Sequence, residues 1–345
     1  ESSNLMNKIL TIENLKVSFP TEDGLVKAVD SLNLDLHEGE TVAIVGESGS
    51  GKTVTSLSVM GLHNPRTTQI SGSIKVKDGS ETIDVVNGNP TKVRLLRGRV
   101  VSMIFQDPMS SLHPFYRIGD QLTEAYLVHN PGKKKEAKLL TLELLDRVGI
   151  PDSKKRIDEY PHQFSGGMRQ RVMIAMALMN TPKILIADEP TTALDVTVQA
   201  QIMTLLKDLQ KEFHMGILLI THDLGVVAQF ADRVSVMYAG DIVESGKVND
   251  IFYDPKAPYT VGLLNSIPKI SYGSKVRLRS IEGQPPSLIN LPTGCPFAPR
   301  CVYKSSAPEG NCESMLPKLI GVDESHPSRC HIPEAQRSQL FGMVK

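Results

Sequence analysis

Residues 46–53 read Gly46-Glu47-Ser48-Gly49-Ser50-Gly51-Lys52-Thr53 and match the phosphate-loop pattern G-x-x-x-x-G-K-[ST] at every fixed position. The apolar run Val42-Ala43-Ile44-Val45 precedes the loop and predicts a strand, and a helix is expected to begin near Lys52. Backbone N–H groups of such a loop curl around phosphate oxygens, and the helix N-terminus adds partial positive charge. We therefore expect residues 46–51 to bind nucleotide phosphates, Lys52 to reach the β- and γ-phosphates, and Thr53 to ligate Mg²⁺.

Two further apolar runs predict buried strands beside the first. Ile184-Leu185-Ile186-Ala187 ends at Asp188-Glu189, and Ile217-Leu218-Leu219-Ile220 ends at Thr221-His222-Asp223. Continuous apolar runs of this length suit a parallel sheet that is covered on both faces. Because ligands bind beyond the carboxyl ends of parallel strands, we expect the polar clusters at the three strand ends to form one site.

The acidic pair Asp188-Glu189 predicts the catalytic part of that site and reads as the end of a Walker B strand. Asp188 is expected to bind Mg²⁺, directly or through water, and Glu189 to polarise the attacking water. Asp188 follows Lys52 by 136 residues (188 − 52), so a sizeable insertion is expected between the two motifs.

The composition of the whole chain excludes several classes of protein. The 345 residues suggest about two domains. Lys plus Arg and Asp plus Glu number 38 each, and a chain without net positive charge is a poor candidate for a general nucleic-acid binder. No apolar run approaches the ~18 residues that span a bilayer, so a soluble or membrane-peripheral protein is expected. Residues 1–5 lack the pattern of a secretory signal, and Met6 is a candidate initiator.

The cysteines divide the chain into two parts. All four of them lie late in the sequence, and they are Cys295, Cys301, Cys312 and Cys330. Prolines also become denser over this part. We therefore predict a large body over residues 8–265 and a smaller, loop-rich, cysteine-bearing unit over residues 266–345.

A further motif, Phe164-Ser165-Gly166-Gly167-Met168-Arg169-Gln170-Arg171, lies between the loop and the acidic pair. It resembles the signature motif of ABC-type ATPases, usually written LSGGQ, and departs from it at Phe164 and Met168. The Ser-Gly-Gly core is kept, and it supplies a hydroxyl and two backbone N–H groups at a helix start, which suits an anion. The resemblance implies that Ser165, Gly166 and Gly167 contact ATP bound to a second subunit.

Other positions match the same family residue by residue. Gln106 resembles the Q-loop glutamine, which contacts Mg²⁺ and links the ATPase core to a helical region. Asp195, in Ala193-Leu194-Asp195, resembles the D-loop, and His222 resembles the switch histidine that contacts the γ-phosphate. Phe19, 27 residues before the loop (46 − 19), is expected to stack on adenine. The resemblance implies Mg²⁺ ligands and catalytic residues, which are Thr53, Gln106 and Asp188 for the metal and Glu189, His222 and Gln106 for hydrolysis.

The resemblance also implies a fold and an assembly. The fold is an α/β P-loop ABC ATPase domain with a mostly parallel core sheet, an antiparallel β subdomain and a helical subdomain at about residues 107–180. A small, loop-rich, cysteine-containing domain follows it. In this family two ATPase domains pair head to tail, so a second ABC ATPase subunit is the expected partner, identical or not.

Four stretches narrow the resemblance to the ATPases of oligopeptide/dipeptide importers. They are residues 106–112, residues 160–178, Pro258-Tyr259-Thr260, and Gly294-Cys295-Pro296-Phe297-Ala298-Pro299-Arg300-Cys301. The resemblance implies ATP hydrolysis that powers peptide import, two transmembrane permease subunits and an extracytoplasmic substrate-binding protein as partners, and no nucleic acid. It places the chain as a peripheral protein at the cytoplasmic face of the cell membrane.

Alternative functions remain at this point. Close relatives serve nickel chelates or oligosaccharides as well as peptides, and no residue of the ATPase encodes the cargo. A soluble Fe–S ABC ATPase acting on ribosomes is another alternative, although such proteins carry two ATPase cores and an N-terminal ferredoxin-like unit. ABC ATPases of DNA repair carry long coiled coils or DNA-binding domains, and neither is visible in the sequence.

The cysteine spacing, C-x5-C-x10-C-x17-C, leaves three interpretations. It matches neither the C-x2-C pair of a zinc ribbon nor a ferredoxin run, so a [4Fe–4S] cluster, structural zinc and free thiols all remain. Some members of the resembling subfamily carry a [4Fe–4S] cluster at such cysteines, which favours the cluster. His326 and His331 flank Cys330 and are additional candidate ligands in the zinc case only.

Overall fold

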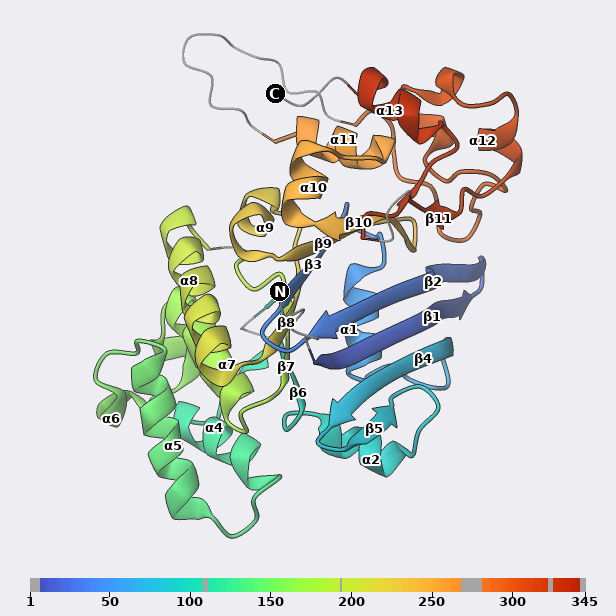
Figure 1. Cartoon of the computed structure of the whole chain (residues 1–345). Coiled ribbons are helices and arrows are strands. Elements are labelled where there is room, and N and C mark those ends of the chain that lie inside the picture. The colour runs from blue at the N-terminus through green and yellow to red at the C-terminus, as the bar shows by residue number, and fades with distance from the viewer. Residues whose placement is uncertain (1–6, 108–110, 193, 268–280, 322–324, 342–345) are drawn as a thin grey trace, which may run out of the picture.

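The computed structural model of the chain describes residues 7–107, 111–192, 194–267, 281–321 and 325–341. Ala193 of the expected D-loop and parts of the expected C-terminal unit lie outside these residues. Two β-sheets form the centre of the molecule, with helices packed around them (Figure 1).

The larger sheet has eight strands in the order β11-β12-β10-β9-β3-β8-β7-β6. Its parallel part runs from β9 to β6, and β10, β12 and β11 add antiparallel strands at one edge. The strands are β3 (Thr41–Val45), β6 (Val101–Ile104), β7 (Ile184–Asp188), β8 (Gly216–Ile220), β9 (Arg233–Tyr238), β10 (Asp241–Lys247), β11 (Leu319–Ile320) and β12 (Ser328–Arg329). The three strands predicted from apolar runs are the neighbours β3, β8 and β7, and all their residues are buried.

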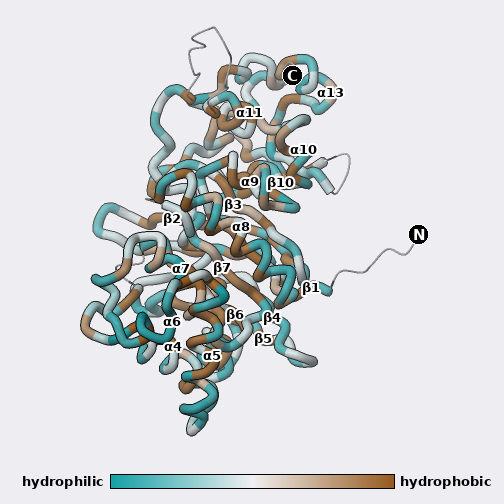
Figure 2. Tube along the Cα trace, turned by 90° about the vertical axis from the view of Figure 1, so that its left-hand side faces the viewer, coloured by the Kyte–Doolittle hydropathy of each residue, from teal (hydrophilic) through white to brown (hydrophobic). Residues whose placement is uncertain are grey.

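Successive residues of the core strands face different layers, which explains their continuous apolar sequence. In β7, Ile184 and Ile186 pack in the cluster shared with the antiparallel sheet, whereas Leu185 and Ala187 pack in the cluster shared with the helices. Side chains alternate between the two faces of a strand, so a strand between two apolar layers needs apolar residues at every position. In Figure 2, which is coloured by hydropathy, the brown of β3 and β7 shows this apolar composition.

The second sheet is antiparallel and has the order β2-β1-β4-β5. Its strands are β1 (Lys8–Thr21), β2 (Gly24–His37), β4 (Gln69–Asp78) and β5 (Glu81–Asp84). It corresponds to the expected antiparallel subdomain. Phe19 lies near the end of β1 and pairs with Val26 of β2.

The helical region lies between β6 and β7, where the long gap between motifs predicted an insertion. Its helices are α4 (Ile118–Leu127), α5 (Lys134–Arg147), α6 (Ser153–Arg156) and α7 (Gly166–Leu178). Buried Leu122, Leu145 and Ile174 join them into one core with the larger sheet. The remaining helices before the C-terminal part are α1 (Lys52–Val59), α2 (Pro90–Leu96), α8 (Val196–Phe213), α9 (Leu224–Phe230), α10 (Val248–Tyr253) and α11 (Pro258–Asn265).

The described C-terminal part packs directly on the body (Figure 1). It holds β11, β12, α12 (Asn311–Ser314) and α13 (Glu334–Leu340). Strand β12 pairs with β10 through Ser328 and Glu244, so this part continues the sheet of the body. The domain boundary near residue 265 stays a prediction.

Candidate active site

The phosphate loop follows β3 and leads into α1, as expected. A Cβ atom at Gly46 would lie 2.1 Å from the carbonyl oxygen of Met237, so no larger residue fits there. Gly51 has φ +106°, and a Cβ atom there would lie 2.3 Å from the carbonyl oxygen of Ala28. At two of the three loop glycines, Gly46 and Gly51, the backbone of the neighbouring strands therefore leaves no room for a side chain.

Lys52, the first residue of α1, is buried, and its ammonium lies against the loop. Its ammonium donates hydrogen bonds of 2.8 Å to the carbonyl oxygens of Gly46 and Glu47. Burial lowers the pKa of Lys52, and the nearby carboxylates of Glu189 and Asp188 oppose that shift. The cation lies where the loop and the acidic strand end meet.

Asp188 ends β7 beside the start of α1. Thr53 donates to its Oδ1 at 3.5 Å, and Ser56 donates to its Oδ2 at 3.3 Å. Burial raises the pKa of Asp188, and the two hydroxyl hydrogen bonds oppose the shift. Hydroxyl and carboxylate oxygens are the ligands that Mg²⁺ prefers, so Thr53 and Asp188 fit a magnesium site. The sequence did not single out Ser56, because no motif contains it. Its only signal is its position one helical turn after the loop.

Glu189 is the meeting point of the other predicted residues. Gln106 donates to its Oε2 at 2.8 Å, and the Nδ1 atom of His222 lies 3.2 Å from its Oε1. Thr192, which the sequence did not single out, also donates to Oε2 at 2.9 Å. The backbone of Glu189 has φ +45°, and its N–H donates to the carbonyl of Ile220 at 2.7 Å. This geometry aims the carboxylate out of the strand end, where a water can be polarised.

The signature residues lie at the surface. Ser165 caps α7 by accepting a hydrogen bond of 3.3 Å from the N–H of Met168, and Ser165 and Gly166 are exposed. A Cβ atom at Gly167 would lie 2.9 Å from Val198, so the motif packs closely against the start of α8. Asp195 caps that helix by accepting from the N–H of Val198 at 3.0 Å. The exposed edge of the motif is open to another molecule.

Phe19 is half-buried at the edge of the antiparallel sheet. Its ring lies 5.9 Å from the ring of His63 in an edge-to-face arrangement. The ring packs against the core between the two sheets. Adenine stacking by Phe19 stays a prediction.

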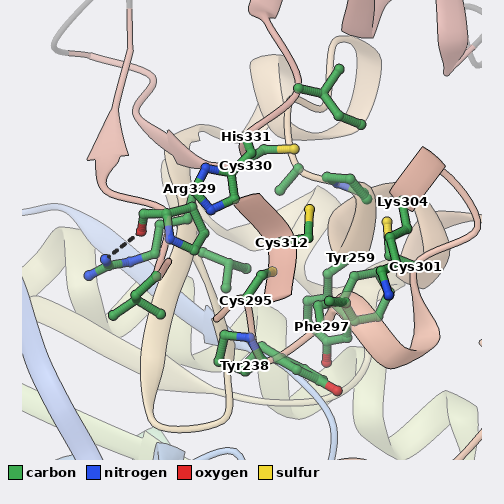
Figure 3. A pocket seen from close by; sticks show the side chains of 18 of the residues that line it. Tyr238, Tyr259, Cys295, Phe297, Cys301, Lys304, Cys312, Arg329, Cys330 and His331 are labelled. Atoms are coloured by element: carbon green, nitrogen blue, oxygen red, sulfur yellow. Dashed lines mark hydrogen bonds between the residues drawn. The ribbon is translucent and has the colours of Figure 1, made fainter. Parts of the chain in front are cut away.

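The four cysteines line one cavity in the C-terminal part (Figure 3). Its other walls are mainly apolar and aromatic, and they include Tyr238, Tyr259 and Phe297. Burial raises the pKa of Cys295 to about 11 and that of Cys301 to about 12, and the neighbouring cysteines add to both shifts. The fold thus brings together four thiols that are spread over 36 residues of sequence (330 − 295 + 1).

Within the described residues, no group of three or more His, Cys, Asp or Glu side chains has an arrangement that would hold one ion. His326 instead contacts Glu244 at 2.8 Å, and His331 contacts the carbonyl of Met315 at 2.8 Å.

Across the described part of the chain, no helix has both the length and the apolar character to cross a membrane.

Two family profiles match the chain. The profile described as ABC transporter matches residues 29–192, and the profile described as oligopeptide/dipeptide transporter, C-terminal region, matches residues 243–307. The first covers the phosphate loop, Gln106, the signature and Asp188-Glu189. The second covers Tyr259 and the first two cysteines.

Individual proteins resemble the chain over most of its length. The dipeptide transport ATP-binding protein DppD of Bacillus subtilis (strain 168) is 49% identical, covering 99% of this chain and 100% of its own. The oligopeptide transport ATP-binding protein OppD of Escherichia coli (strain K12) is 51% identical over 87% of this chain and 88% of its own. Among solved structures, a dimeric ATP-binding cassette bound to ADP and Pi has a TM-score of 0.61 and 27% identity, covering 70% of this chain and 99% of that one.

Proposed function

We infer the function from one premise: the chain belongs to the ABC transporter ATPases, among the ATP-binding proteins of the oligopeptide/dipeptide transporters. It hydrolyses ATP, and this hydrolysis powers the import of peptides. Relatives at about half identity are named dipeptide or oligopeptide transport ATP-binding proteins, and a profile of the oligopeptide/dipeptide transporter C-terminal region also matches. The observation in the structure that best supports this function is the convergence of Gln106 and His222 on Glu189, beside Asp188 and the phosphate loop.

The proposed site binds ATP by its phosphates. Backbone N–H groups of residues 46–51 and the start of α1 would surround the β- and γ-phosphates, and Lys52 would donate to phosphate oxygens from its place beside the loop carbonyls. Thr53, Asp188 and Gln106 would hold Mg²⁺, which when bound offsets negative charge on the phosphates. Phe19 is proposed to stack on the adenine.

The proposed hydrolytic step centres on Glu189. Its carboxylate would accept a hydrogen bond from the attacking water and orient that water toward the γ-phosphorus. Gln106 and Thr192 hold one carboxylate oxygen, which fixes the direction of the other. His222, with its side chain 63% exposed, is placed to contact the γ-phosphate when a second subunit closes over the site.

The working unit is proposed to be a head-to-tail dimer. Exposed Ser165 and Gly166, together with Gly167, would face the γ-phosphate held by the partner's loop, and Asp195 would lie near the same interface. ATP would thus bind two surfaces at once, and hydrolysis would weaken their contact. Two transmembrane permease subunits and an extracytoplasmic binding protein complete the proposed transporter, with this chain docked at its cytoplasmic face and contacting no nucleic acid.

A [4Fe–4S] cluster is proposed for the cavity lined by Cys295, Cys301, Cys312 and Cys330. All four thiols line one cavity, and four cysteine thiolates are the usual ligands of a [4Fe–4S] cluster. The cluster would staple residues 266–345, the proposed C-terminal unit, to the body of residues 8–265.

Replacing Glu189 tests the ATPase assignment. In the full-length protein, Glu189→Gln should keep MgATP binding within about threefold and lower turnover by at least about 100-fold, because the amide is a poor proton acceptor. Glu13→Gln, a change at an exposed carboxylate of β1, is the control and should leave turnover intact. Full turnover by Glu189→Gln would remove Glu189 from the catalytic role, and a wild-type protein that neither binds nor hydrolyses ATP would overturn the function.

Anaerobic purification tests the cluster. The expected protein is brown, absorbs near ~400 nm and contains about four irons per chain. Cys301→Ser should lose the absorbance and the iron, and its C-terminal part should become easier to cleave with protease. A colourless sample that contains one zinc per chain would instead support the zinc alternative.

A further inference from the structure

A buried arginine of the cysteine-bearing part reaches the phosphate loop. Arg300 Nη1 lies 2.6 Å from Glu47 Oε2, and Arg300 Nη2 lies 2.9 Å from Glu47 Oε1. The arginine side chain is 4% exposed and the glutamate side chain 29%, so the two-pronged ion pair is buried on its arginine side and partly open to water at the carboxylate. Glu47 is the second residue of the loop, and 253 residues separate the two partners.

Glu47 is held through every polar group that it has. Its N–H donates to the hydroxyl of Tyr259 at 2.9 Å, and its carbonyl accepts from Lys52 at 2.8 Å and from the N–H of Ser50 at 3.3 Å. The carboxylate takes Arg300. A rotation of Glu47 would therefore move the carbonyl that positions Lys52, the cation expected to meet the phosphates.

The C-terminal part and the body together fix Arg300 in turn. Its Nε donates to the carbonyl of Glu282 at 3.0 Å, and its Nη1 lies 3.3 Å from the hydroxyl of Tyr238. The ring of Phe297 contacts those of Tyr238 and Tyr259, with centroid distances of 5.3 and 5.4 Å (Figure 3). Arg300 directly precedes Cys301, so the segment that lines the cysteine cavity also sets the arginine.

The pairing has an electrostatic consequence for the loop. An unpaired carboxylate beside a polyphosphate site would repel the ligand, and Glu47 already lies close enough to act on the charge of Lys52. A bidentate guanidinium neutralises a carboxylate and fixes its orientation at the same time. A lysine ammonium, which has the same charge, could neutralise the carboxylate but could not fix its orientation.

We propose that Arg300 and Tyr259 are positioning residues of the ATP site: they hold Glu47, and through it Lys52. Tyr259 acts from α11 of the body, and through Arg300 the cysteine-bearing part forms one wall of the machinery that binds phosphate. This proposal rests on the proposed function, because it needs a chain that binds MgATP. Loss of Arg300 should leave the Glu47 charge unpaired and the loop less ordered, which weakens ATP binding without touching Glu189.

The chain offers a matched control for Arg300. Arg329 also ties the C-terminal part to the body through a shielded carboxylate, with 3.2 Å between its Nη2 atom and Asp241, and it does not contact the loop. Arg300→Met and Arg329→Met should both lower Tm. Only Arg300→Met should raise the dissociation constant for MgATP, by about tenfold or more, while Arg329→Met stays within about twofold.

Two further measurements separate positioning from simple attachment. Hydrogen exchange of residues 46–52 should be faster in Arg300→Met than in Arg329→Met at equal distance below Tm. Glu47→Gln and Arg300→Met should also act non-additively on MgATP affinity, because they remove two halves of one contact. If Arg300→Met does not fold, Arg300→Lys serves instead, with a smaller expected loss of affinity.

The outcomes are distinct. Equal MgATP affinity in wild type, Arg300→Met and Arg300→Lys would overturn the inference and leave the ATPase function standing. Additive effects of the Glu47 and Arg300 changes would also count against it. A wild-type chain that fails to bind MgATP would instead remove the proposed function on which the inference rests.

Discussion

Gln106 donates a hydrogen bond of 2.8 Å to the carboxylate of Glu189, although 83 residues separate them in the chain. Gln106 leaves the end of β6, at the entry to the helical region, and Glu189 follows β7, its neighbour in the sheet. A movement of the helical region that displaces Gln106 would therefore act on the carboxylate of Glu189. The contact offers a short physical connection between the proposed permease-binding region and the proposed catalytic base.

Removal of the Gln106 amide should slow turnover more than it weakens binding. Gln106→Ala is expected to lower kcat by about 10- to 100-fold and to weaken MgATP affinity by less than about tenfold, since it frees the base and removes one of three proposed Mg²⁺ ligands but leaves the loop unaltered. Gln69→Ala, at the start of β4 in the antiparallel sheet, is the control. An unchanged kcat in Gln106→Ala would show that the contact does not guide Glu189.

Ser56 and Ser58 form a natural comparison within α1. Both are fully buried and both donate to a backbone carbonyl, Ser56 to that of Thr53 at 2.8 Å and Ser58 to that of Val54 at 2.7 Å, but only Ser56 also reaches Asp188. Each alanine variant should lose about 1 kcal/mol of stability, measured by urea unfolding. Only Ser56→Ala should shift the Mg²⁺ concentration that gives half-maximal ATPase activity, by about three- to tenfold. An equal shift in both variants would separate Ser56 from the metal site.

The buried carboxyl of Asp241 should make stability fall as the pH rises from about 4 to about 7. Burial raises the pKa of Asp241 to about 6 from 3.8, against the opposing charge of Arg329; Asp30 and Lys16 also face it, with opposite effects. The folded protein thus keeps a proton that the unfolded chain has released, and this contribution, complete below pH 4, is lost as the pH rises through 6. It amounts to at most about 3 kcal/mol. Asp241→Asn should flatten this part of the pH profile in chemical unfolding.

Asp35 should change the pH dependence of stability in the opposite direction. Burial alone would raise the pKa of Asp35, but the charges of Arg233 and Lys8 outweigh it and hold the pKa below its usual value. Its stabilisation is therefore present at neutral pH and is lost on acidification. Asp35→Asn should lower the free energy of unfolding at pH 7 and have less effect near pH 3. The same direction of change at pH 7 in Asp35→Asn and Asp241→Asn would contradict these assignments.

Complementation can show whether one site uses two chains. Lys52→Ala removes the loop cation, and Ser165→Arg blocks the signature, so each variant alone should be inactive. A mixed dimer would keep one site with both parts intact. An equal mixture should therefore regain about a quarter of wild-type turnover, because half of the dimers are mixed and each has one working site of two. No recovery from a mixture that forms dimers would oppose a composite site.

Much of the fold and of the ATP site could be predicted because their signals are local. The run Val42–Val45 and the pattern through Thr53 specify a strand, a tight loop and a helix from neighbouring residues alone. Glu189 and His222 each follow a strand that an apolar run predicted, so that prediction already places them at one edge of the sheet. Gln106 was identified only by the family resemblance, because no apolar run predicted β6; the structure places it in hydrogen-bond contact with Glu189.

The contacts that the sequence did not reveal come from distant side chains without a fixed spacing. Ser56 and Thr192 sit near recognised motifs, but only the packing of α1 against β7 shows which hydroxyl meets Asp188. Tyr259 stood out as part of a resembling stretch and not as a partner of the loop. The cysteine spacing also left the geometry of the four thiols open, since three of them lie outside helices and strands and Cys312 lies in the short helix α12.

The amino-acid order alone specified a nucleotide-binding α/β core, because period, turn chemistry and motif spacing act over a few neighbouring residues. It also specified that a cysteine-rich part follows the core. That this part reaches back to the phosphate loop, with Arg300 on Glu47, depended on how the chain folds over 253 residues. Such a contact is selected by shape and charge in three dimensions, and no local pattern along the chain records it.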